Sequence, residues 1–220
     1  PGKVFDYLKV KPDFWFPLIL AVVISIISGY RFFDVAINDQ ITRIEQNENI
    51  PADRKDAILD QIEASREGSR KIINSVVIAP IFVVVIYLII PLVFLLIGSV
   101  FLGGKAHYKQ LLSVFSYSYL IVIFLGTLVK APLIMAKNTV NIQMSPAAFL
   151  DLEQISGALY RFIGSFDIFV IWFLIVFALG FSTIYGFSKL KGLVSVFIAW
   201  LLYVVIVNVV ISGLFQGLLG

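Results

Sequence analysis

One uninterrupted apolar stretch limits the folds open to this chain more than any other feature. Between Gln110 and Met135 the only charged residue is Lys130. A helix of this length covers the ~30 Å hydrocarbon core of a bilayer at about 1.5 Å per residue. Similar runs recur: 60% of the residues are hydrophobic and 14% are charged, against about 25% charged in soluble domains. We therefore expect an all-α, polytopic membrane domain over residues 1–220.

Five apolar segments are long enough to be membrane spans, and polar or glycine-containing turns separate them. They cover about residues 14–30, 72–102, 110–135, 162–187 and 193–219. The second is longer than the ~30 Å hydrocarbon core requires, so it must tilt, bend or protrude. Pro80 and Pro91 are the expected bends. A short surface helix is predicted after Ser145, an N-cap followed by a proline.

The connector between the first two spans predicts a protruding helical hairpin over residues 31–71. In this connector apolar residues still recur at helical spacing among charged neighbours, and Pro51 is well placed to begin the return helix. Two isoleucine stripes would face each other, and we expect them to form a partner-binding arm: Ile37, Ile41 and Ile44 on one leg, and Ile58 and Ile62 on the other. The length exceeds what a connector needs. The alternative is a solvated spacer, which the mixed charges also fit.

Small and polar residues mark faces where spans should pack together. Ala21, Ser25 and Gly29 recur every four residues in the first span, and small residues let helices approach closely in lipid. In the fifth span a polar stripe lies beside a Gly213-x-x-x-Gly217 pair; its residues are Asn208, Ser212 and Gln216. This stripe predicts helix association or a polar interior that could hold a solute.

Lys130 and Asp167 are predicted to lie at the same level of the membrane. The third span ends near Lys130, and the fourth begins just before Asp167 on the return path. A charge pair there would replace lost hydration. The alternative is that each side chain reaches water separately, Lys130 by snorkelling. Arg161 is a second possible partner for Asp167.

The distribution of lysines predicts the orientation. With the N-terminus in the cytoplasm and the C-terminus outside, the N-terminal segment and two short turns without acids lie inside. Their lysines are Lys3, Lys9, Lys11, Lys105, Lys109, Lys189 and Lys191. The 31–71 connector has seven basic residues, which argues for the opposite orientation, but it also has nine acids and is long.

The sequence contains no motif for catalysis, cofactor binding or metal binding. It has no cysteine and one histidine, His107, so thiolate sites and paired-histidine metal sites are excluded. It also has no phosphate-binding glycine loop and no nucleophile elbow. The net charge of +3 is explained by membrane-flanking turns, so we expect no nucleic-acid partner.

Three segments in this order resemble the Ypt-interacting-protein (Yip) domain family, in its prokaryotic branch. They are KPDFWFP, LGGKAHYKQLLSVFSYSY and GSFDIFVIWFLIVFALGFSTIY, and the resemblance covers nearly the whole chain. It implies five membrane helices, a cytoplasmic N-terminus and a prokaryotic cytoplasmic membrane. Eukaryotic members are associated with Rab-type GTPases and some bacterial members with export systems. This chain lacks the Asp-Leu-x-Gly-Pro signature, so GTPase binding is not carried over, and the family supplies no catalytic residue.

Two functions follow as hypotheses. The first is a non-enzymatic membrane protein that contacts lipid and organises or assists other membrane proteins, or associates with itself. The second is a transporter or channel for a small solute or ion. It would use the polar stripe of the fifth span together with Lys130, Asp167 and bends at Pro80 and Pro91.

Overall fold

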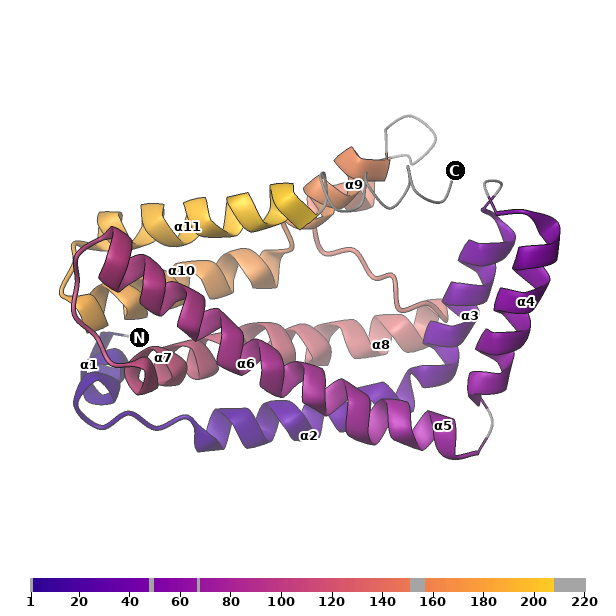
Figure 1. Cartoon of the computed structure of the whole chain (residues 1–220), viewed down its shortest axis with the longest axis horizontal. Helices are drawn as coiled ribbons and strands as arrows, with labels where there is room; N and C mark the ends of the chain where they lie inside the picture. The colour runs from indigo at the N-terminus through magenta and orange to yellow at the C-terminus, as the bar shows by residue number, and fades with distance from the viewer. Residues whose placement is uncertain (1, 48–49, 67, 151–156, 208–220) are drawn as a thin grey trace.

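The long apolar runs fold into helices that lie side by side along the longest axis of the molecule (Figure 1). The computed structural model describes residues 2–47, 50–66, 68–150 and 157–207. Every regular element in these residues is helical. The N-terminal half contains α1 (Gly2–Val10), α2 (Trp15–Arg31), α3 (Phe33–Glu45), α4 (Ala52–Glu63), η1 (Ala64–Arg66), α5 (Ser69–Ile72), η2 (Ile73–Ile78), α6 (Ala79–Leu96) and η3 (Ile97–Phe101).

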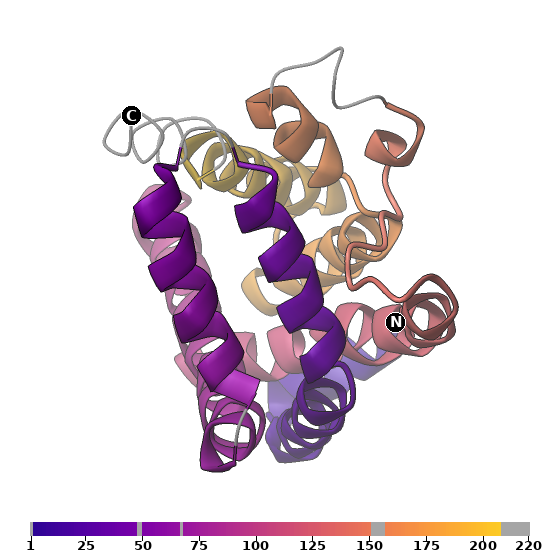
Figure 2. The same ribbon diagram turned by 90° about the vertical axis from the view of Figure 1, so that its right-hand side faces the viewer.

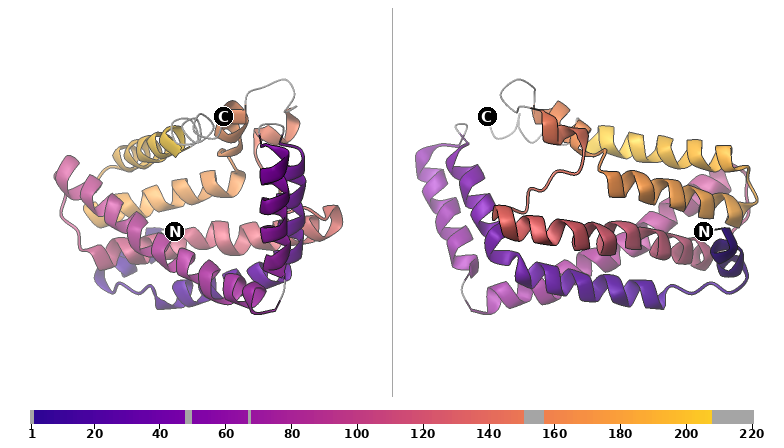
Figure 3. Two further views of the ribbon diagram at one scale, coloured as in Figure 1. Left: turned by 45° about the vertical axis from the view of Figure 1, so that its right-hand side comes forward. Right: turned by 180° about the vertical axis from the view of Figure 1, so that it is seen from behind.

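The C-terminal half begins with a second long helical rod and ends with an antiparallel helix pair. Its elements are α7 (Tyr108–Leu120), η4 (Ile121–Gly126), α8 (Thr127–Lys137), η5 (Pro146–Phe149), α9 (Gly157–Gly164), α10 (Ile168–Tyr185) and α11 (Lys189–Val205). Helix α10 packs against α7 and α11. It therefore lies inside the bundle, while α11 covers it (Figure 3).

Three continuous helices in the described residues are long and apolar enough to cross a membrane. They are Ser69–Phe101, Tyr108–Lys137 and Ile168–Tyr185. A fourth is added if α1 and α2, which meet at a bend of 113°, count as one span. The sequence predicted five, and the last of these would continue from α11 into residues outside the described part of the chain.

An aromatic column fills the interior of the bundle. Tyr87, Phe115, Phe177 and Phe181 are each 0–1% exposed. Ring pairs connect Tyr87 to Phe115 and Phe115 to Phe173, with centroids 5.3 and 5.7 Å apart. Further pairs continue along α10 through Phe177 to Phe181. Such edge-to-face and offset arrangements add to the stabilisation from burial alone.

Small residues allow close helix crossings where the sequence places them. Ala21 is fully buried, and a methyl group built on Gly29 would lie 3.5 Å from the Ser75 backbone. The predicted small-residue face of the first span therefore meets the second span. A second crossing lies between α10 and α11, where a methyl group on Gly192 would come within 2.9 Å of the Ala178 carbonyl oxygen.

The fourth span begins at Ile168, not near residue 162 as the sequence suggested. Asp167 has an extended backbone with φ −61° and ψ 136° and accepts the Phe169 N–H through its side chain. A residue in this role ends the preceding structure and starts a new helix. Residues Gly157–Gly164 consequently form the separate helix α9. The predicted surface helix after Ser145 is one 3₁₀ turn, η5, within the described residues.

Three π-helical segments lie within the two longest helices, and no pattern in the sequence predicted them. They are η2, η3 and η4. Segment η2 ends at Ile78, two residues before Pro80, which has no N–H and would crowd the carbonyl four residues earlier in an α-helix. A wider turn relieves that crowding. Both Pro80 and Pro91 are buried, so these positions face protein.

Candidate functional site

Charged residues gather at the two ends of the bundle. One end holds α1, the turn after η3 and the turn after α10; we call it the lysine end (Figure 1). The opposite end holds the α3–α4 pair, α9 and the segment between α8 and α10. The α3–α4 pair, which we call the arm, is the candidate interaction site.

The two helices of the arm run antiparallel and pack side by side (Figure 2). Ile37 is 6% exposed. The other isoleucines of the two predicted stripes are partly buried: Ile41, Ile44, Ile58 and Ile62. Near the tip, Lys55 Nζ donates a hydrogen bond to the Glu45 carbonyl oxygen at 2.9 Å. The arm therefore buries an apolar seam and exposes charged outer faces.

Polar contacts hold the arm in one orientation relative to the bundle. Oδ2 of Asp39 accepts hydrogen bonds from Thr139 Oγ1 at 2.9 Å and from the Val140 N–H at 2.7 Å. Asp34 Oδ2 lies 2.6 Å from Lys71 Nζ, which links the base of α3 to the start of the second span. Asp39 thus connects the first connector to the segment that follows α8, about 100 residues later in the chain.

The structure brings Lys130 and Asp167 together at the same end. Lys130 Nζ lies 2.7 Å from Asp167 Oδ2, and the two side chains are 31% and 13% exposed. The backbone N–H of Ile168 donates to the Met144 carbonyl oxygen at 3.1 Å, which fixes the segment after α8 against the start of α10. The pair therefore lies at the edge of the bundle, where three chain segments meet.

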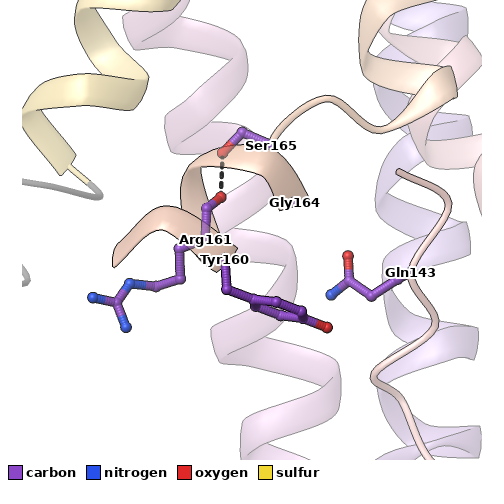
Figure 4. Close-up of a pocket in the computed structure, with 5 residues that line it drawn as sticks. All are labelled: Gln143, Tyr160, Arg161, Gly164 and Ser165. Atoms are coloured by element: carbon purple, nitrogen blue, oxygen red, sulfur yellow. Dashed lines mark hydrogen bonds between the residues drawn. The ribbon is translucent and has the colours of Figure 1, made fainter. Parts of the chain in front are cut away.

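A shallow pocket of about 220 Å³ lies between α9 and the segment after α8 (Figure 4). Tyr160 points its ring toward Gln143, while the Arg161 side chain extends to the other side. Ser165 Oγ donates to the Arg161 carbonyl oxygen at 2.9 Å. An adjoining pocket of about 280 Å³ shares two of these residues and is lined by Leu133, Lys137, Asn141, Ile142, Gln143, Met144, Ala147, Ala148, Leu150 and Tyr160. The two linings together offer amides, a phenol, a hydroxyl, a guanidinium and a lysine.

The remaining predicted polar residues, Asn208, Ser212 and Gln216, lie outside the described residues. Within the described part of the chain, no group of three or more His, Asp or Glu side chains could hold a metal ion.

Sequence reasoning missed a glycine–aromatic lock at the lysine end. A methyl group on Gly98 or Gly104 would overlap the Tyr185 ring, and Tyr185 stacks on Phe187 with centroids 5.1 Å apart. The Tyr185 hydroxyl lies 3.2 Å from Ser99 Oγ and 3.2 Å from the Leu95 carbonyl oxygen. The glycine turn and the end of α10 each belong to a segment quoted above for the family resemblance. Their contact brings these two segments together in space.

The profile of the Yip1 domain family matches residues 1–211. The chain belongs to the Yip1 domain family. This confirms the resemblance found in the sequence, and the match includes both the lock and the arm of this Yip1-family protein. It is also 26% identical over 220 residues to a protein called "Membrane protein YknW" from Bacillus subtilis strain 168, covering 100% of this chain and 89% of that protein. No solved structure matches the chain.

Proposed function

We propose that this Yip1-family protein is a non-enzymatic membrane protein that binds other membrane proteins through its arm and organises or assists them, as a trafficking or export accessory. We further propose five spans: α2, Ser69–Phe101, Tyr108–Lys137, α10 and a last span that starts with α11. In this topology the lysine end lies in the cytoplasm of a prokaryotic cell. The arm then stands outside the cytoplasmic membrane, on the same side as the C-terminus.

The observation that supports this role most directly is the double hydrogen bond to Asp39. A solvated spacer needs no fixed orientation, whereas a binding arm gains affinity when its orientation is set in advance. Asp39 sets that orientation through Thr139 and Val140. The outer faces of α4 remain free for contact, because Asp53, Asp56 and Asp60 are exposed.

The alternative, a transporter or channel, requires a polar path through the bundle. The described interior is instead filled by the aromatic column, and Pro80 and Pro91 are themselves buried. The polar residues of the last span are the remaining candidates for such a path. Packed aromatic rings leave little room for a hydrated solute, which favours the binding role.

The test is co-purification from native membranes with two altered proteins. In the first, a short flexible linker replaces residues 33–69. In the second, only the exposed arm carboxylates change, through Asp53→Asn, Asp56→Asn and Asp60→Asn. The matched control changes an exposed carboxylate outside the arm, Asp6→Asn in α1.

We expect both arm variants to lose partners that the wild-type chain and the control retain. Thermal unfolding in detergent must first show that the bundle survives each change. If partners and oligomer size are the same for all four proteins, the arm is a spacer and the binding role is wrong.

A further inference from the structure

The lysine end carries a charge imbalance that its own contacts do not neutralise. Three segments of the chain meet there (Figure 3). They carry seven lysines, and all seven are exposed. They are Lys3, Lys9, Lys11, Lys105, Lys109, Lys189 and Lys191. Asp6 and Asp13 are the acids on these segments, and Asp13 Oδ1 accepts the Trp15 N–H at the start of α2. In the described residues, no salt bridge involves any of the seven lysines.

Two of the seven lysines, Lys9 and Lys191, contact other parts of the protein through their ammonium groups. Lys9 Nζ donates to the Thr183 carbonyl oxygen at 2.9 Å, in the last turn of α10. A cation there is favourable because the C-terminal end of a helix carries partial negative charge. Lys191 Nζ lies 3.9 Å from the centroid of the Phe187 ring. The other five lysines donate no side-chain hydrogen bond among the described residues and remain available to a ligand.

Helix α1 has two apolar faces, and only one of them is used inside the molecule. Phe5 and Leu8 are each 2% exposed and belong to the core of the bundle. On the other side Val4, Tyr7 and Val10 are 50%, 59% and 78% exposed. Lys3 and Lys11 flank this exposed row in the sequence. An apolar row bordered by lysines is typical of a helix in the headgroup region of a bilayer.

The orientation of α1 suits that location. It meets α2 at 113°, so when α2 crosses the membrane α1 lies close to the membrane plane. Gln110 Nε2 donates to the Lys9 carbonyl oxygen at 2.7 Å, which fixes the end of α1 on α7. The exposed apolar row is thereby held beside the start of α7, at one end of a candidate membrane span.

We propose that the lysine end is a binding surface for anionic phospholipids, with α1 as its interfacial helix. The headgroup phosphates would be bound by Lys3, Lys11, Lys105, Lys109 and Lys189, and the acyl chains would contact Val4, Tyr7 and Val10. Basic residues near an anionic membrane surface are attracted to it, and the attraction increases with their number. The proposal goes beyond the role of the arm and does not depend on it.

The experiment measures thermal unfolding of the full chain in neutral detergent micelles. Phosphatidylglycerol, phosphatidylcholine with the same acyl chains, or inorganic phosphate is added. A ligand that binds only the folded protein raises the melting temperature. We expect phosphatidylglycerol to raise it by about 3 °C or more, phosphatidylcholine to raise it much less, and added salt to reduce the difference.

Two variants and one control locate the effect. Combining Lys3→Gln, Lys11→Gln, Lys105→Gln and Lys189→Gln should remove most of the preference for phosphatidylglycerol. Tyr7→Ser with Val10→Ser should weaken it, and both changes are on exposed side chains. The control removes four exposed cations at the opposite end and should leave the preference for phosphatidylglycerol intact. Its changes are Arg43→Gln, Arg54→Gln, Arg70→Gln and Lys137→Gln.

Equal shifts with the two lipids would overturn the proposal. So would a lysine variant that keeps the full preference, or a control that loses it. If inorganic phosphate reproduces the shift, the lysines bind free anions and the assignment to lipid is wrong.

Discussion

Asp167 contacts Lys130 with one carboxylate oxygen and the first turn of α10 with the other. Oδ2 lies 2.7 Å from Lys130 Nζ, and Oδ1 accepts the Phe169 N–H at 2.9 Å. The same residue therefore starts the fourth long helix and joins it to the end of the third. Two substitutions at this position can separate these roles.

Asp167→Asn should lower stability less than Asp167→Ala. Asparagine retains an N-cap acceptor, so it loses only the ion pair, worth up to about 1 kcal/mol for a partly exposed pair. Alanine also loses the cap, which adds about 1 kcal/mol. Melting temperatures in detergent give the order. Lys130→Met should cause little further loss of stability in the Asp167→Asn background, because the ion pair is already broken. Fully additive losses would show that the two charges act separately.

Tyr87→Phe should be neutral or stabilising. The Tyr87 side chain is 0% exposed, and its hydroxyl has no hydrogen-bond partner in the described structure. A buried polar group without a partner is unfavourable by about 1–3 kcal/mol. Tyr185→Phe is the matched control and should be destabilising, since its hydroxyl lies near Ser99 Oγ and the Leu95 carbonyl oxygen. A reversed order in thermal unfolding would contradict this assignment.

Gly192→Ala should destabilise the bundle, whereas Gly29→Ala should be tolerated. The added methyl group at Gly192 would overlap Ser182 Oγ and approach the Ala178 carbonyl oxygen, and overpacking of this kind costs about 1–3 kcal/mol. At Gly29 its nearest neighbour, in Ser75, is 3.5 Å away, an ordinary contact. Equal melting temperatures for the two variants would mean that α10 and α11 do not cross as closely as described.

Asp39→Ala should loosen the arm without unfolding the spans. The change removes the acceptor for Thr139 Oγ1 and for the Val140 N–H. Amide hydrogen exchange should therefore accelerate at Val140 and along α3. Asp60→Ala, at an exposed arm position, is the control and should leave both rates unchanged. Unaltered exchange in Asp39→Ala would show that the arm is held by other contacts.

Local patterns in the sequence predicted much of the fold. Continuous apolar runs predict helices, and the spacing of Ala21, Ser25 and Gly29 predicts a close contact because small side chains at helical spacing share one face. The contact between Lys130 and Asp167 could also be anticipated, since antiparallel neighbours bring the end of one helix to the start of the next.

Contacts between distant segments could not be derived in this way. Nothing near Gly98 in the sequence indicates that the Tyr185 ring fills the space above it, because that pairing depends on how two turns meet in three dimensions. The hydrogen bond between Asp39 and Thr139 likewise joins two segments that are distant in the sequence. Segment η2 illustrates a further limit: Pro80 indicates a disturbance of the regular α-helix, but the π-helical form of that disturbance depends on the packing around it.

The proposed topology places the arm and the lysine end on opposite sides of the membrane. The chain has no cysteine, so single cysteines at exposed Gln61 in α4 and exposed His107 can be tested in intact cells with a membrane-impermeant thiol reagent. We expect Gln61→Cys to be labelled from outside and His107→Cys only after the cells are permeabilised. Labelling of His107→Cys in intact cells, with Gln61→Cys protected, would contradict the topology and the proposed role of the arm.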